Sequence, residues 1–119
     1  MSSFYIGDGT TCDDVVVLAV GGEIDYAASP QLRERILAHI KADRRRLVLD
    51  LSAATFIDST AIGVLTGAAT KLREADGGSL AVVCTHENVL QIFTISGLES
   101  MISLYSSCEE ALTALAVAG

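Results

Sequence analysis

Two hydroxyl side chains beside a carboxylate form the group in this chain that most suggests chemistry. Asp58, Ser59 and Thr60 precede an apolar helical pattern that begins at Ala61. Asp, Ser and Thr commonly begin helices, because their side-chain oxygens accept hydrogen bonds from unpaired N–H groups of the first turn. The hydroxyls of Ser59 and Thr60 are therefore predicted at the surface, at a helix start. This place suits a charge-changing modification, although on spacing alone an ordinary helix start is the more common interpretation.

The helix predicted over residues 60–74 carries two glycines on the side opposite its apolar face. A glycine inside a helix costs about 1 kcal/mol relative to alanine, so Gly63 and Gly67 call for an explanation. One explanation is a bare surface that a partner's backbone can approach. The alternatives are a neighbouring element of the same chain, or no role at all. The apolar face, which we expect to pack on a sheet, consists of Ala61, Leu65, Ala68 and Leu72.

The elements that must position these residues alternate between apolar strands and helices, which predicts crossover units and a largely parallel sheet. The first two strands are joined by a turn too short for a crossover, so that pair is predicted to be antiparallel. The fold class is therefore α/β, with a mixed, mostly parallel sheet of about five strands and about four helices. Strands are predicted at 4–6, 15–20, 47–51, 80–84 and 101–104, with 7–14 as a turn, and helices at 29–42, 60–74, 86–96 and from 108.

Three further helix starts are predicted from capping residues. Ser29 is expected to cap a helix whose first position is Pro30. Thr85 is expected to cap the next-to-last helix, and Ser107 with Glu110 forms a capping box for the last one.

Polar residues follow two central strands of the predicted sheet. Asp25 comes after the strand at 15–20, and Asp58 and Ser59 follow the next strand after a short loop. Sites in parallel sheets form beyond the carboxyl ends of the strands. Asp25, Asp58, Ser59, Thr60 and the Gly63/Gly67 surface are therefore predicted to form one patch.

Composition limits the classes of function. The 119 residues suit a single domain over 1–119, and the net charge of −7 argues against nucleic-acid binding and suits a partner with a basic face. The sequence has neither a membrane-spanning run nor a signal-peptide pattern, so we expect a cytoplasmic protein without membrane contact. It has no nucleophile elbow and no phosphate-binding loop, and neither His39 nor His86 stands out as a base. We expect no catalysis, no cofactor and no metal.

The three cysteines, Cys12, Cys84 and Cys108, do not form a metal-binding spacing, and reduced thiols are the expected state. A second hypothesis concerns Cys84 and Cys108, which end or follow neighbouring predicted strands and so are expected at the same sheet edge. If their Cα atoms lie about 4.4–6.8 Å apart, they form a possible redox pair.

The stretch DSTAIG at 58–63 resembles the signature of the STAS domain, specifically of anti-sigma factor antagonists. GEID at 22–25 and ISGL at 95–98 are similar to two further motifs of that family, so the resemblance covers nearly the whole chain. It implies a STAS-like fold, with Ser59 as the phosphorylated serine and Thr60 as a competing acceptor. The sequence departs from the signature at Ala61, where the family usually has glycine.

The resemblance also implies a function and its partners. The unphosphorylated protein would bind an anti-sigma factor that is also a serine kinase, and would thereby free the sigma factor. Phosphorylation would switch this binding off, and a serine phosphatase would restore it. One alternative is an unphosphorylated STAS scaffold in a lipid-transport or stress-sensing complex. A receiver domain fits less well, because no lysine follows the last strand after Leu104.

Overall fold

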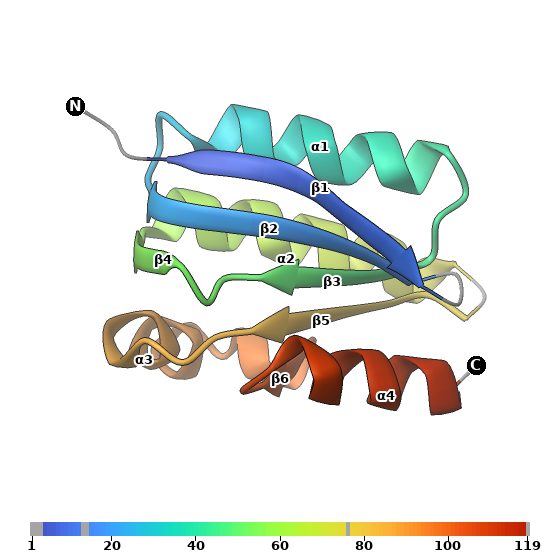
Figure 1. The fold of residues 1–119 in the computed structure, drawn as a ribbon. Coiled ribbons are helices and arrows are strands. Elements are labelled where there is room, and N and C mark those ends of the chain that lie inside the picture. The colour runs from blue at the N-terminus through green and yellow to red at the C-terminus, as the bar shows by residue number, and fades with distance from the viewer. Residues whose placement is uncertain (1–3, 13–14, 76, 119) are drawn as a thin grey trace.

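The computed structural model describes residues 4–12, 15–75 and 77–118, and within them the chain forms six strands, four α-helices and one 3₁₀ helix (Figure 1). The strands are β1 (Tyr5–Cys12), β2 (Val15–Ile24), β3 (Arg46–Asp50), β4 (Ala54–Ile57), β5 (Ser79–Val83) and β6 (Ser103–Tyr105). The helices are α1 (Ser29–Lys41), α2 (Ser59–Glu74), α3 (Glu87–Ser96), the 3₁₀ helix Leu98–Ser100 and α4 (Cys108–Ala118).

The strands form one sheet in the order β1-β2-β3-β5-β6, and β4 pairs separately with β2. Only the pair β1–β2 is antiparallel among the described strands, which confirms the predicted direction of this pair. In each of the other pairs the two strands are parallel, and at least one helix lies between them in the sequence. The loop between β3 and β4 contains no helix, and these two strands do not pair with each other. The predicted mixed, mostly parallel α/β fold is confirmed.

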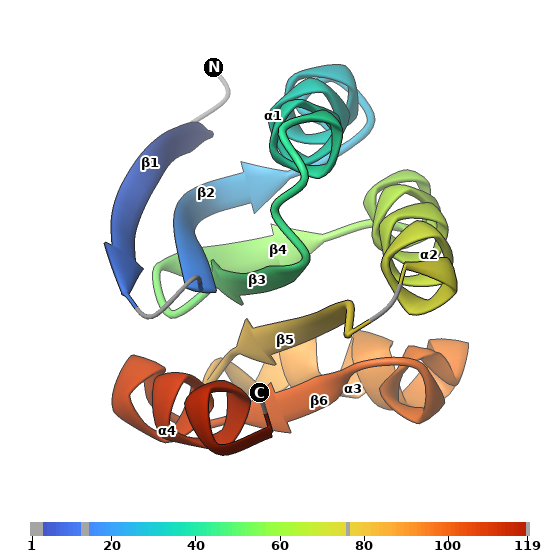
Figure 2. The same cartoon turned by 90° about the vertical axis from the view of Figure 1, so that its right-hand side faces the viewer.

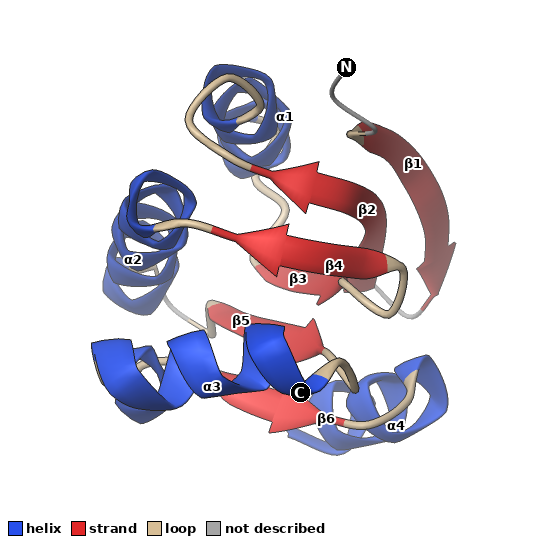
Figure 3. Ribbon diagram, turned by 90° about the vertical axis from the view of Figure 1, so that its left-hand side faces the viewer, coloured by secondary structure: helices blue, strands red, loops and turns tan. Residues whose placement is uncertain are grey.

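Helices cover both faces of the sheet, which explains why its central strands are apolar without alternation (Figure 2). Successive residues of β3 enter two different cores: Leu47 and Leu49 face α1 and α2, and Val48 faces α4. Figure 3 shows the same layers from the other side, with α1 and α2 on one face and α4 on the other. Leu32 and Ile36 of α1 are buried in the larger core, as their helical spacing predicts.

The strands differ from the sequence prediction mainly at the N-terminal hairpin and at β4. The prediction of a turn over 7–14 is wrong for 7–12, which belong to β1 and include a register shift between Asp8 and Thr11, and positions 13–14 lie outside the described residues. β2 continues beyond the predicted end to Ile24, through Gly22 at φ 80°. The strand β4 was not predicted, because four residues are too few to show a periodic pattern.

Two predicted caps are wrong, and one is confirmed. The N-cap of α1 is Ala28 and not Ser29, whose hydroxyl instead donates to the Asp25 carbonyl at 3.0 Å. The N-cap of α3 is His86 and not Thr85, because the His86 Nδ1 accepts from the Asn88 N–H at 3.3 Å. Before α4, the Ser107 hydroxyl accepts from the Glu110 N–H at 3.2 Å, which confirms the serine half of the predicted capping box. The Glu110 carboxylate accepts from the Ser106 hydroxyl at 3.0 Å.

Candidate functional site

Asp58 is the residue that caps α2, and this leaves the neighbouring hydroxyls unused. Its carboxylate accepts from the Ala61 N–H at 3.0 Å. Ser59, the first residue of the helix, and Thr60 are both exposed. Within the part of the chain that the structure describes, neither hydroxyl makes a hydrogen bond. The hydroxyl of Ser59 is therefore accessible, as its place at the helix start predicts.

Pairing between β2 and β4 brings Asp25 to the same sheet edge as Asp58. Ile24 and Ile57, which precede the two aspartates, are register partners in parallel strands. The Asp58 N–H also donates to the Ile24 carbonyl at 3.2 Å. Asp25 and Asp58 therefore lie at the same sheet edge, as expected, because β2 pairs with the unpredicted strand β4.

The Asp25 side chain shapes the turn that enters α1. Its Oδ1 accepts from the N–H groups of Ala27 and Ala28, each at 3.1 Å. Asp25 is half-buried, and Glu23, two residues earlier on β2, is exposed. Together with Asp58 these residues make the edge acidic, which favours a partner with basic side chains there.

Ala61 fits this backbone without strain. It lies in the first turn of α2, it is fully buried, and its N–H is the donor to the capping carboxylate. The described residue other than glycine that has positive φ is Asp43, not Ala61. Alanine at this position therefore gives the helix a better former than glycine does.

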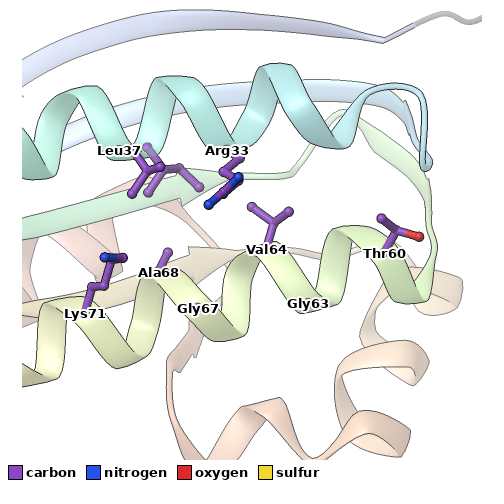
Figure 4. Close-up of a pocket in the computed structure, with 9 residues that line it drawn as sticks. Arg33, Leu37, Thr60, Gly63, Val64, Gly67, Ala68 and Lys71 are labelled. Carbon is purple, nitrogen blue, oxygen red and sulfur yellow. The ribbon is translucent and has the colours of Figure 1, made fainter.

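A groove of about 310 Å³ lies between α1 and α2, and Gly63 and Gly67 lie along it (Figure 4). Both glycines are exposed, and a Cβ built on either one meets nothing within 4 Å. Packing against α1 therefore does not require a glycine at either position. The groove begins at Thr60, beside the candidate acceptor Ser59.

Two exposed aromatic side chains at this edge were not predicted. Tyr26 directly follows Asp25 and is 73% exposed, and Phe56 lies on β4 with 46% exposed. Tyrosine is enriched among the residues that dominate protein–protein binding energy, and phenylalanine among interface residues generally. Aromatic residues beside a strand end usually pack inward, so the sequence contained no signal for their exposure.

Cys84 and Cys108 carry free thiols in this structure. Burial raises the pKa of Cys84, and burial together with the neighbouring Asp50 carboxylate raises the pKa of Cys108 to about 11. A raised pKa lowers the thiolate fraction, which is the reactive form. These environments argue against reactive thiols, and the redox pair stays a prediction without support. Cys12 has no described side-chain environment.

The carboxyl of Asp50 has a pKa below its usual range. Partial burial raises this pKa, but hydrogen bonds from the Ser52 hydroxyl, the Ser52 N–H and the Cys108 thiol together lower it further. The Ser52 hydroxyl lies 2.6 Å from Asp50 Oδ1. This cluster joins the end of β3 to the start of α4, away from the groove between α1 and α2.

No group of three or more His, Cys, Asp or Glu side chains that could hold a metal occurs within 4–12, 15–75 and 77–118. No helix in those same ranges is long and apolar enough to span a membrane. His39 and His86 are half-buried, and His86 serves as the helix cap described above.

Comparison with known proteins places this arrangement in a family. The STAS domain model matches residues 10–111. The anti-sigma-B factor antagonist of Bacillus subtilis is 36% identical over 92 residues, which cover 76% of this chain and 81% of that protein. A crystal structure of an anti-sigma factor antagonist from Mycobacterium paratuberculosis has a TM-score of 0.87 at 30% identity and covers 95% of this chain and 94% of that one.

A third comparison concerns the fold alone. The structure of the Bacillus cell fate determinant SpoIIAA in its phosphorylated form has a TM-score of 0.69 at 21% identity. It covers 93% of this chain and 99% of that one. The likeness shows that the same arrangement of sheet and helices occurs in a phosphorylated protein.

Proposed function

This chain belongs to the STAS domain family, and we propose that it is an anti-sigma factor antagonist controlled by phosphorylation of Ser59. In its unmodified form it binds an anti-sigma factor that is also a serine kinase, and this binding frees the sigma factor. A serine phosphatase removes the phosphate and restores binding. The protein acts in the cytoplasm and has no catalytic activity of its own.

The observation that carries the proposal is the free hydroxyl of Ser59 at the start of α2. A kinase needs an accessible acceptor, and Ser59 is exposed with no hydrogen bond within the described residues. The capping role belongs to Asp58, so modification of Ser59 leaves the cap in place. Thr60 is exposed as well and is the competing acceptor.

Electrostatics explain how a phosphate switches binding without a change of fold. Phosphorylation adds about −1.5 to −2 charges at pH 7. At the N-terminus of a helix, the dipole stabilises a negative charge by roughly 0.3–1 kcal/mol, so the domain tolerates it. A docked partner would bury that charge beside Asp58, and an unpaired buried charge costs several kcal/mol. Each 1.4 kcal/mol corresponds to about a tenfold loss of affinity.

The partner surface consists of the acidic edge and the adjoining groove. Asp25 and Asp58 present carboxylates, Ser59 and Thr60 present hydroxyls, and Gly63 and Gly67 leave the wall of the groove bare. The comparisons support this class of partner, because the names of the relatives are those of anti-sigma factor antagonists. The phosphorylated form of SpoIIAA supports a phosphate switch within the same fold.

Phosphosite mapping tests the proposal. The purified chain is incubated with ATP and a purified anti-sigma factor that has serine kinase activity, and the phosphopeptides are sequenced by mass spectrometry. We expect a single phosphate on Ser59, none on the Ser59→Ala variant, and unchanged kinase binding by that variant. Phosphate on Thr60 alone would show that Thr60, and not Ser59, is the phosphorylated residue. Binding without any phosphorylation would favour the scaffold alternative, and no binding would reject the proposed function.

A further inference from the structure

The groove between α1 and α2 carries two positive charges in an otherwise acidic protein. Arg33 lies on the α1 wall and Lys71 on the α2 wall, while the chain has a net charge of −7. Figure 4 shows the Arg33 side chain extending toward α2 and the Lys71 side chain extending toward α1, with Leu37 and Val64 between the helices. The two cations therefore face a common apolar space from opposite walls.

Neither cation has a partner within the described residues. Arg33 and Lys71 make no ion pair or side-chain hydrogen bond in residues 4–12, 15–75 and 77–118. Both side chains are exposed, so water solvates them in the isolated chain. Covering the groove with an apolar or basic surface would remove this water without a replacement, which is unfavourable. A partner that covers the groove is therefore expected to bring a negative charge.

We propose that the groove receives an acidic side chain from a helix of the anti-sigma kinase, which pairs with Arg33 and Lys71 while the helix backbone lies against Gly63 and Gly67. This inference rests on the proposed function and adds the chemistry of the partner's contacting surface. The bare glycines let a second helix approach closely, and the apolar floor of Ile36 accepts its small side chains.

The distribution of charge also orients the partner. The groove begins at Thr60, and Lys71 lies eleven residues further along α2, or about 16 Å at the rise of a helix. The carboxylates of Asp25 and Asp58 lie at the Thr60 end, and the two cations lie further along. Figure 4 shows Arg33 opposite Val64 and Gly67, between Thr60 and Lys71. A partner is therefore expected to be basic where it contacts Ser59 and acidic further along the groove, between Arg33 and Lys71. The reversed orientation places like charges together at both ends.

Charge reversal tests the groove against matched controls. The double variant Arg33→Glu/Lys71→Glu is compared with Arg44→Glu/Arg73→Glu, which changes the net charge equally at exposed positions outside the groove. We expect the groove variant to lose at least tenfold in affinity for the purified kinase. The control variant is expected to lose less than threefold, and circular dichroism should show both folded. Equal losses in the two variants would overturn the proposal.

Zero-length crosslinking identifies the acidic residue on the partner. A carbodiimide joins a lysine amine to a carboxylate only when the two are in contact, and the chain has just two lysines, Lys71 and Lys41, of which Lys41 does not line the groove. We expect mass spectrometry to find Lys71 joined to one Asp or Glu of a kinase helix. Changing that acid to lysine should restore the affinity of the Lys71→Glu variant by at least fivefold. No crosslink at Lys71 in the complex, or no restoration, would contradict the pairing.

These outcomes separate the inference from the function on which it rests. If the unmodified chain does not bind the kinase at all, the proposed function fails first. If it binds and Lys71 crosslinks instead to a second copy of this chain, the groove is a self-association surface and the inference fails alone. The inference also fails, and the proposed function stands, if octanoate, a small apolar carboxylate, occupies the groove while kinase affinity stays unchanged.

Discussion

Alanine at Gly63 and Gly67 should stabilise the domain and weaken its complex. Both positions lie inside α2, and a Cβ at either one meets nothing within 4 Å. Each substitution should therefore gain the helix propensity of alanine, about 1 kcal/mol in the free energy of unfolding. In a domain of this size, that gain corresponds to a rise in Tm of about 4 °C.

The effect on binding should have the opposite sign. If a partner backbone lies against the bare helix surface, each new methyl group overpacks the interface, which typically costs about 1–3 kcal/mol. That cost corresponds to a roughly five- to 150-fold weaker complex. Because the isolated chain becomes more stable, a loss of affinity cannot result from unfolding.

The assay combines a thermal melt followed by circular dichroism with calorimetric titration of the kinase. Thr70→Ala is the matched control, because Thr70 is exposed on α2 and does not line the groove. It should raise Tm modestly and leave the affinity unchanged. Variants of Gly63 and Gly67 that are more stable and bind as tightly as the original chain would refute the close approach of a partner.

The remaining predictions concern the cap, the exposed aromatics and the buried thiol. Asp58→Ala should lower the free energy of unfolding by about 1 kcal/mol through loss of the helix cap, measured by urea denaturation; an unchanged value would show that the cap contributes nothing. Tyr26→Ala and Phe56→Ala should each weaken kinase binding at least fivefold without lowering Tm, because both side chains are exposed; unchanged affinity would place them outside the interface. The raised pKa of Cys108 contributes stability below pH 9 that is lost as pH rises toward about 11. The lowered pKa of Asp50 contributes stability above its unfolded value, near pH 4, that is lost on further acidification. Replacing Asp50 by Asn should therefore lower the pKa of Cys108 and speed its alkylation near pH 9, and an unchanged rate would exclude this coupling.

The core faces were predictable because their pattern is periodic. The apolar residues of α2, such as Leu65 and Leu72, are buried as their spacing indicates. The unbroken apolar run over 15–20 is typical of a strand covered on both faces, and residues of β2 are indeed buried in both cores. Asp25 and Asp58 were also placed at one edge correctly, because parallel strands end on the same side of the sheet.

The failures have two other physical causes, which are contacts distant in sequence for the strand β4 and the backbone geometry of single turns for the caps. The strand β4 forms because β2 extends past Gly22 and offers a free edge, and four residues carry no pattern that reveals this. Caps depend on local backbone geometry, so Ala28 replaced the expected Ser29 once the Asp25 carboxylate had bound the turn.

Sequence patterns also could not predict the groove between α1 and α2. Arg33 and Lys71 line the same groove only because α1 and α2 lie side by side on the same face of the sheet. On their separate helices, each cation resembles any solvated surface charge. The glycines Gly63 and Gly67 did signal an unusual surface, and the open space beside them now argues against packing within the chain as their explanation.

The affinity of the kinase for the chain phosphorylated on Ser59 tests the central claim most directly. Titration calorimetry would compare the unmodified chain with the singly phosphorylated chain, and circular dichroism would verify that both are folded. A charge switch predicts at least a tenfold loss of affinity with an unchanged spectrum, and a smaller loss of the same sign for Ser59→Asp. Equal affinity of the phosphorylated and unmodified chains would contradict the account.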